Sequence, residues 1–173
     1  PLDWDTIWQE QIVKKLNETT PVSEAEMKNL LQSFEKLAQE SRNAKAWVDG
    51  MSEISKNTQS DVSLEARRDM IRHRLGSMPL EWSDKLNIVA TELETSERKI
   101  FNEQSDVSLL DAVTASSAVQ GVWKPVPING FRYYDGGSYS VENPDVVEDA
   151  NKVIILTTNL PVQTPYALSL IHI

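Results

Sequence analysis

The sequence predicts an α/β fold in which a helical first half is followed by a half that mixes strands and helices. Three observations lead to this prediction. Apolar residues recur at helical spacing through residues 1–76. From Leu86 onward, short β-branched runs replace that spacing. An Asn129-Gly130 pair then stands between two apolar segments, which is a strong signal for a tight hairpin. Strands that alternate with helices favour an α/β layer over an all-helical bundle.

Two amphipathic helices are expected at the start of the chain. Apolar side chains recur every three or four positions over residues 3–17 and predict the first helix. Ser23 and Glu26 then form a capping box, which marks the beginning of the second helix. Its apolar stripe covers residues 27–38 and is expected to continue toward Val48.

A third helix and two strands should follow. Ser63 is placed to cap a helix over residues 64–75, and Gly76 stands where a C-terminal glycine is expected. Residues 86–91 form a short apolar, β-branched run that is typical of a buried strand. Residues 99–101 predict a second, shorter strand.

The last part of the chain should contain one more helix, the hairpin and a final strand. Ser108 begins a helix that is rich in small and apolar residues. The hairpin is expected to pair residues 126–128 with residues 131–134. Residues 153–157 are the clearest candidate for a buried strand in the whole sequence.

Composition excludes several classes of function. The chain of 173 residues has 26 acidic and 17 basic side chains, a net charge of −9 that disfavours nucleic-acid binding. There is no cysteine, so disulfides and thiolate chemistry are excluded, and with two histidines no metal site is expected. We expect no cofactor. No apolar run is long enough to span a bilayer and no signal peptide is visible, so a cytoplasmic location is expected.

The candidate site is the Asp135-Gly136-Gly137 motif, directly after the expected hairpin strand. An aspartate at a strand end projects from the edge of the sheet, where open α/β sheets place their ligands. The two glycines permit unusual backbone angles and leave space beside the carboxylate, so we expect at least one of them at positive φ. On these three residues alone, a plain Asp-Gly turn is the alternative interpretation.

The segments around this motif resemble the C-terminal part of the patatin-like phospholipases. The resemblance rests on the small-residue segment 115–126, the hairpin and Asp-Gly-Gly motif in 128–137, and the strand and turn in 86–95. It covers roughly residues 64–161. It implies one partial patatin-like domain over residues 1–173, with three α/β/α layers, a helical segment over 1–76 and a strand and helix segment over 86–161.

The resemblance also implies a chemistry. Patatin-like enzymes are lipid acyl hydrolases in which an aspartate activates a serine directly, without a histidine. Asp135 would be that aspartate, Gly136 and Gly137 would complete its motif, and Asn143 would anchor the loop that follows. The substrate would be a fatty acyl ester of a phospholipid or related lipid, reached in lipid degradation by transient contact with a membrane surface.

The sequence departs from the family pattern at several places. Gln120 replaces a proline, which is expected to loosen that turn, and Glu92 and Ser96 replace Asp and Gly. Neither the Gly-x-Ser-x-Gly nucleophile elbow nor the glycine-rich oxyanion loop occurs. We therefore expect a fragment that is inactive alone and carries only the aspartate of the dyad. Two alternatives stay open: a non-catalytic patatin-related scaffold that binds lipid or a partner, and a different α/β fold in which Asp135 begins an ordinary turn.

Other polar residues receive structural interpretations. His73 lies among arginines in 67–74, a pattern typical of a solvated helical face. The acidic cluster between Glu142 and Asp149 matches no calcium loop and is expected to be a solvated turn. His172 belongs to the segment 167–173, for which disorder or an artefactual tail is expected rather than a function.

Overall fold

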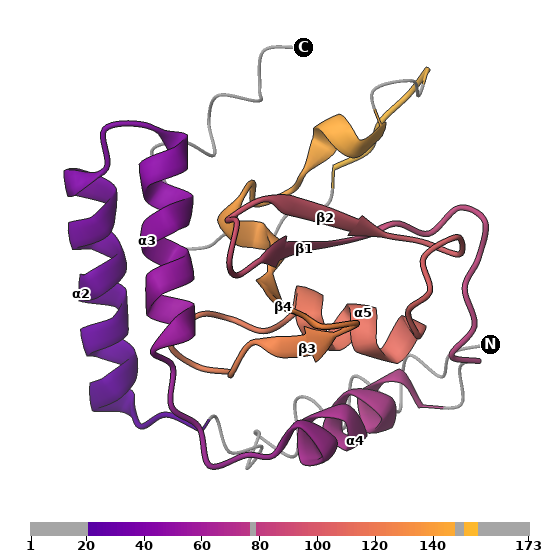
Figure 1. Cartoon of the computed structure of the whole chain (residues 1–173), viewed down its shortest axis with the longest axis horizontal. Coiled ribbons are helices and arrows are strands. Elements are labelled where there is room, and N and C mark those ends of the chain that lie inside the picture. Colours follow the sequence, from indigo (N-terminus) through magenta and orange to yellow (C-terminus); the bar gives the residue numbers. More distant parts are fainter. Residues whose placement is uncertain (1–20, 77–78, 148–150, 156–173) are drawn as a thin grey trace.

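The first half of the chain is helical and the second half mixes strands with helices, as the sequence predicts (Figure 1). The computed structural model describes residues 21–76, 79–147 and 151–155. The helix expected over residues 3–17 lies outside these ranges. Three helices open the described part, namely α2 (Glu24–Glu40), α3 (Ala44–Lys56) and α4 (Leu64–Leu75).

The capping box at the start of α2 is confirmed. Ser23 Oγ accepts the Glu26 N–H, and the Glu26 carboxylate accepts the Ser23 N–H in return. The expected continuation of this helix toward Val48 is wrong, because α2 ends at Ser41 and a second helix starts behind Asn43. Asn43 accepts the Ala46 N–H at 2.9 Å and is an N-cap. The two helices lie side by side in Figure 1.

The third helix begins and ends where the sequence predicts. Ser63 Oγ accepts the Ala66 N–H at the start of α4. Gly76 follows the last turn with φ +60°, an angle that glycine adopts at little cost. The boundaries of α4 therefore follow from local sequence alone.

The strands form one antiparallel sheet in the order β2-β1-β4-β3. Its strands are β1 (Ile88–Glu92), β2 (Arg98–Phe101), β3 (Val126–Ile128) and β4 (Phe131–Asp135). The hairpin between β3 and β4 is confirmed, and both of its central residues have positive φ, 49° at Asn129 and 86° at Gly130.

The inner strands β1 and β4 bring distant parts of the chain together. Ala90 lies opposite Asp135 and Glu92 lies opposite Tyr133. This pairing places the end of β4, and with it the Asp-Gly-Gly motif, beside the middle of β1.

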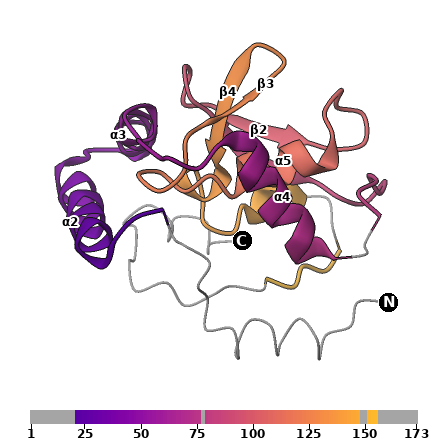
Figure 2. The same ribbon diagram turned by 90° about the horizontal axis from the view of Figure 1, so that it is seen from below.

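Helix α5 (Leu109–Ser116) packs across the sheet, and α4 packs against α5 (Figure 2). Ala112 and Ala115 of α5, with Ala118 just beyond it, are fully buried, and their small side chains let the helix approach the strands closely. The same core contains larger side chains from α3 and the sheet: Trp47, Val48, Met51, Leu93, Phe101, Val126, Ile128, Tyr133 and Tyr134. The three layers implied by the resemblance stay a prediction.

The strand expected over residues 153–157 is wrong for its described part. Val153, Ile154 and Ile155 belong to no strand and are 46%, 80% and 53% exposed. Residues 156 and 157 lie outside the described ranges. A β-branched run indicates a good fit to a pleated, half-buried surface, and it becomes a strand only where a partner edge is present.

Candidate functional site

The backbone of Asp135 is held by β1 and by the segment that follows α5. Asp135 is the last residue of β4 and pairs with Ala90 of β1. Its N–H donates to the Ala118 carbonyl at 3.2 Å, beyond the end of α5. Its own carbonyl accepts the Thr91 hydroxyl at 3.2 Å. The position of the aspartate is therefore fixed by the sheet and by the segment after α5 together.

Asp135 is partly buried at the end of β4. Its Oδ1 accepts the Gly137 N–H at 2.8 Å, and it makes no ion pair with any residue in the described ranges. Burial raises the pKa of Asp135 above its ordinary value, while the Gly137 hydrogen bond and the charge of Arg67 act in the opposite direction. An aspartate with a raised pKa holds a proton more strongly than an exposed one.

The expectation of a positive φ at Gly136 or Gly137 is wrong. These residues begin the short 3₁₀ helix η1 (Gly136–Ser138), and the glycines at positive φ are elsewhere in the described chain. Glycine is required at position 136 for a different reason. A Cβ there would lie 2.4 Å from the carbonyl oxygen of Val89 on β1, so no side chain fits.

Asn143 connects the turn to the loop that follows. Its Nδ2 donates to the Gly136 carbonyl at 3.3 Å and to the Ser140 carbonyl at 2.5 Å. Both contacts tie Asn143 to the turn that follows Asp135, and the anchoring role that the resemblance implies stays a prediction. Asn143 itself has a φ of +46° and precedes the 3₁₀ helix η2 (Pro144–Val147).

An arginine of β2 holds the far side of the same loop. Arg98 donates to Asn143 Oδ1 at 3.3 Å and pairs with Asp145 at 2.6 Å. Its guanidinium also lies 4.9 Å from the centre of the Tyr139 ring. The hydrogen bond from Arg98 lowers the pKa of Asp145. Of the predicted acidic cluster, Asp145 is therefore an ion-pair partner, while Glu148 and Asp149 lie outside the described residues.

Two site residues were missed by sequence reasoning. The Trp47 indole N–H donates to the Ser138 carbonyl at 2.9 Å, although Trp47 lies on α3. The buried Gln120 donates from Nε2 to Ser138 Oγ. Gln120 therefore supplies a contact to the turn that begins with the Asp-Gly-Gly motif. No local pattern in the sequence reports this contact.

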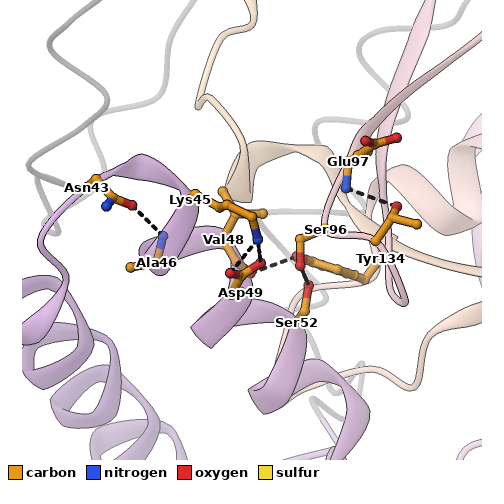
Figure 3. Close-up of polar contacts among 10 residues, drawn as sticks. Asn43, Lys45, Ala46, Val48, Asp49, Ser52, Ser96, Glu97 and Tyr134 are labelled. Atoms are coloured by element: carbon orange, nitrogen blue, oxygen red, sulfur yellow. Dashed lines mark hydrogen bonds and ion pairs between the residues drawn. The ribbon is translucent and has the colours of Figure 1, made fainter.

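The residue before the aspartate faces a polar network on α3 (Figure 3). The Tyr134 hydroxyl lies 2.8 Å from Ser52 Oγ and donates to the Val48 carbonyl at 3.3 Å. Burial raises the pKa of Tyr134 to about 12. Ser52 also contacts Ser96, which sits at φ +60° in the turn between β1 and β2. This network fixes α3 against β4 and against the turn between β1 and β2.

A cavity of about 500 Å³ lies beside the loop that Asn143 anchors. It is lined by the start of β1, by the loop up to Val147 and by residues 153–155. Val89 and Asn143, which both contact Gly136, belong to its wall, and Asp135 does not.

The prediction that residues 67–74 form a solvated helical face is only partly correct. His73 is exposed, as predicted. The prediction is wrong for Arg67, which is buried and donates to the Ser117 carbonyl at the end of α5. Trp4, Trp8 and His172 lie outside the residues that the structure describes. Among those it does describe, no three acidic or histidine side chains gather as metal ligands.

Comparison with known proteins gives no family. No protein-family model matches the chain, and no curated protein matches it in sequence. Within the ranges described here, no helix is both long enough and apolar enough to cross a membrane.

Proposed function

We propose that this chain carries the aspartate of a Ser-Asp dyad in a longer patatin-like lipid acyl hydrolase. The observation that supports the proposal is the Asp135 carboxylate at the end of β4, which is partly buried and without an ion-pair partner among the described residues. Burial of this kind is typical of acids and bases that act in catalysis. The serine, its elbow and the oxyanion loop would come from outside this chain.

In the proposed reaction, Asp135 is the general base. Its carboxylate accepts the proton of the serine hydroxyl as the serine oxygen attacks the ester carbonyl, and it returns that proton to the leaving alcohol. A pKa raised by burial makes the carboxylate a stronger base than an exposed aspartate. The Gly137 N–H binds one oxygen, Oδ1, so Oδ2 is the oxygen that would accept the proton.

The close approach of Gly136 to Val89 supports the same proposal. It draws the chain across β1 immediately after the aspartate, so that no side chain of residue 136 stands beside the carboxylate. The substrate class, a fatty acyl ester, and transient contact with membranes follow from the resemblance and belong to this proposal. The cytoplasmic location expected from the sequence belongs to it as well.

The test begins with the coding sequence upstream of this chain. A glycine-rich loop and a Gly-x-Ser-x-Gly elbow there would support the enzyme, and their absence would favour the scaffold alternative. The longer protein should hydrolyse a nitrophenyl ester of a fatty acid. The 173-residue chain, which lacks both motifs, is the negative control.

The decisive variant is Asp135→Asn in the longer protein. An asparagine oxygen can still accept the Gly137 N–H, so the turn is kept while proton acceptance is lost. We expect kcat to fall by about 10²–10⁴-fold, the usual range for a positioned general base. A near-normal kcat in a folded variant would show that Asp135 is only a turn residue.

A further inference from the structure

Arg67 occupies an unusual place for an arginine on the first turn of a surface helix. It is only 7% exposed. Its Nη2 donates to the Ser117 carbonyl at 2.6 Å and to Ser117 Oγ at 2.9 Å, with a longer bond to the Thr114 carbonyl. The guanidinium carbon lies 4.1 Å from the centre of the Trp123 ring. A cation is favourable at the C-terminal end of α5, where carbonyl groups lack helical partners.

The end of α5 that Arg67 holds is the part that fixes the aspartate. Ser117 is the C-cap of α5, and the next residue, Ala118, accepts the Asp135 N–H. The contacts of Arg67 therefore reach the backbone of Asp135 through one peptide unit.

The charges of Arg67 and of the Asp135 carboxylate also act on each other. No ion pair joins the two side chains, but the negative charge of Asp135 raises the pKa of Arg67 against the larger effect of burial. Arg67 Nε is buried and has no hydrogen-bond partner within the described part of the chain. A buried charge with an unused donor is costly unless another charge compensates it. The Ser117 and Thr114 oxygens and the Trp123 ring offset part of this cost, and the negative charge of Asp135 acts in the same direction.

We propose that Arg67 is the positioning residue of Asp135: it anchors the segment that holds the aspartate backbone, and its positive charge favours the ionised carboxylate. Its meaning for catalysis rests on the proposed function, whereas the two physical effects on Asp135 do not. Two other titratable groups act on this pair: Arg74 on α4, whose charge acts on Arg67, and the neutral Tyr134 hydroxyl on β4, whose pKa the Asp135 charge raises.

Carbon NMR of the 173-residue chain tests both effects. The Cγ signal of Asp135, assigned by its loss in Asp135→Asn, is followed through a pH titration. Arg67→Met removes the charge and keeps an apolar side chain of similar length. We expect its Asp135 midpoint to rise by about one pH unit, because an opposite charge nearby favours the carboxylate. Exchange of the Asp135 amide hydrogen should also become faster.

Two further variants separate charge from anchoring. Arg67→Lys keeps the charge but lacks the planar fork, so the midpoint should stay near that of the wild type while amide exchange increases. Arg68→Met is the matched control. Arg68 is the neighbour of Arg67, and its Nε donates to Asp111 of α5 at 2.6 Å. This contact does not involve Ser117 or Ala118, through which Arg67 reaches Asp135. Its removal should change neither readout.

The proposal is overturned if Arg67→Met is folded and leaves both the midpoint and the amide exchange of Asp135 at wild-type values. If Arg67→Met does not fold, Arg67→Lys decides: unchanged amide exchange in that variant also overturns the proposal. Absence of ester hydrolysis in the longer protein would remove the proposed function but would leave both NMR results as they are.

Discussion

Gly136 lies so close to β1 that a Cβ at this position would come within 2.4 Å of the Val89 carbonyl oxygen and 2.9 Å of its side chain. The approach involves backbone on both sides, so neither partner can move away by a change of rotamer. Glycine is therefore required by space at position 136 rather than by its backbone angle.

We predict that Gly136→Ala lowers the free energy of unfolding by about 1–3 kcal/mol, the usual effect of overpacking a buried site. Gly137→Ala is the control, because its Cβ would meet only Asp135 Oδ1, at 3.0 Å, and a side chain can adjust. Urea denaturation of the two variants gives the comparison. Equal losses would show that the Val89 contact is not what requires glycine.

The pH dependence of stability should report the burial of Asp135. Burial raises its folded-state pKa above the 3.8 of an unperturbed aspartate. Its contribution to stability is therefore complete below pH 3.8 and is lost as the pH rises through the folded-state pKa. Asp135→Asn removes this loss. We expect the variant to gain stability relative to the wild type as the pH rises from 3.8 to 7, measured by urea denaturation.

Asp145 should behave in the opposite sense. The hydrogen bond from Arg98 lowers its folded-state pKa below 3.8, so its contribution is present above pH 3.8 and is lost as the pH falls through the folded-state pKa. Asp145→Asn should be less stable than the wild type at pH 7, and the difference should shrink in acid. The same sign of pH dependence in Asp135→Asn and Asp145→Asn would contradict one of the two assignments, and the sign itself shows which.

The ion pair between Arg98 and Asp145 should also show measurable coupling. Both side chains are about one-fifth exposed, and Arg98 holds Asn143 in addition. In a double-mutant cycle of Arg98→Met and Asp145→Asn, we expect a coupling free energy of about 0.5–3 kcal/mol. The exposed pair of Lys45 and Asp49 on α3 is the control, and its coupling should be smaller. If the two substitutions lower the free energy of unfolding additively, the ion pair between Arg98 and Asp145 does not stabilise the loop.

Ser96 combines a left-handed backbone with useful hydrogen bonds, and two variants separate these effects. Its φ of +60° favours glycine, while its hydroxyl contacts Ser52 at 2.9 Å and Asp49. Ser96→Gly and Ser96→Ala lose the same hydroxyl, but only the glycine variant relieves the backbone. We expect Ser96→Gly to be more stable than Ser96→Ala by about 1 kcal/mol in urea denaturation. Equal stability would show that the turn between β1 and β2 relaxes in both.

Local features were predicted from sequence and distant contacts were not. The capping box at Ser23, the C-terminal glycine at Gly76 and the hairpin at Asn129-Gly130 each depend on a few neighbouring residues. By contrast, the burial of Arg67 depends on the carbonyl of Ser117, fifty positions away, which no local pattern reports.

The site shows the same division. The position of Asp135 at a strand end follows from the hairpin pattern, but the reason for the glycine after it lies on another strand, at Val89. The contact of Trp47 with Ser138 likewise joins α3 to η1 and has no counterpart in local sequence. The apolar run at 153–155 is the converse case, in which strong β propensity meets no partner strand in the described part of the chain.

The register of Ala90 with Asp135 has a consequence for the order of folding. Each hairpin, β1 with β2 and β3 with β4, closes a short stretch of chain, whereas pairing β1 with β4 closes a long one and is entropically slower. Asp135 meets Ala90 and Thr91 only through that long-range step. The environment that raises the pKa of its carboxylate should therefore be assembled late, and the Asp135 signal would report the joining of two preformed hairpins rather than the formation of either one.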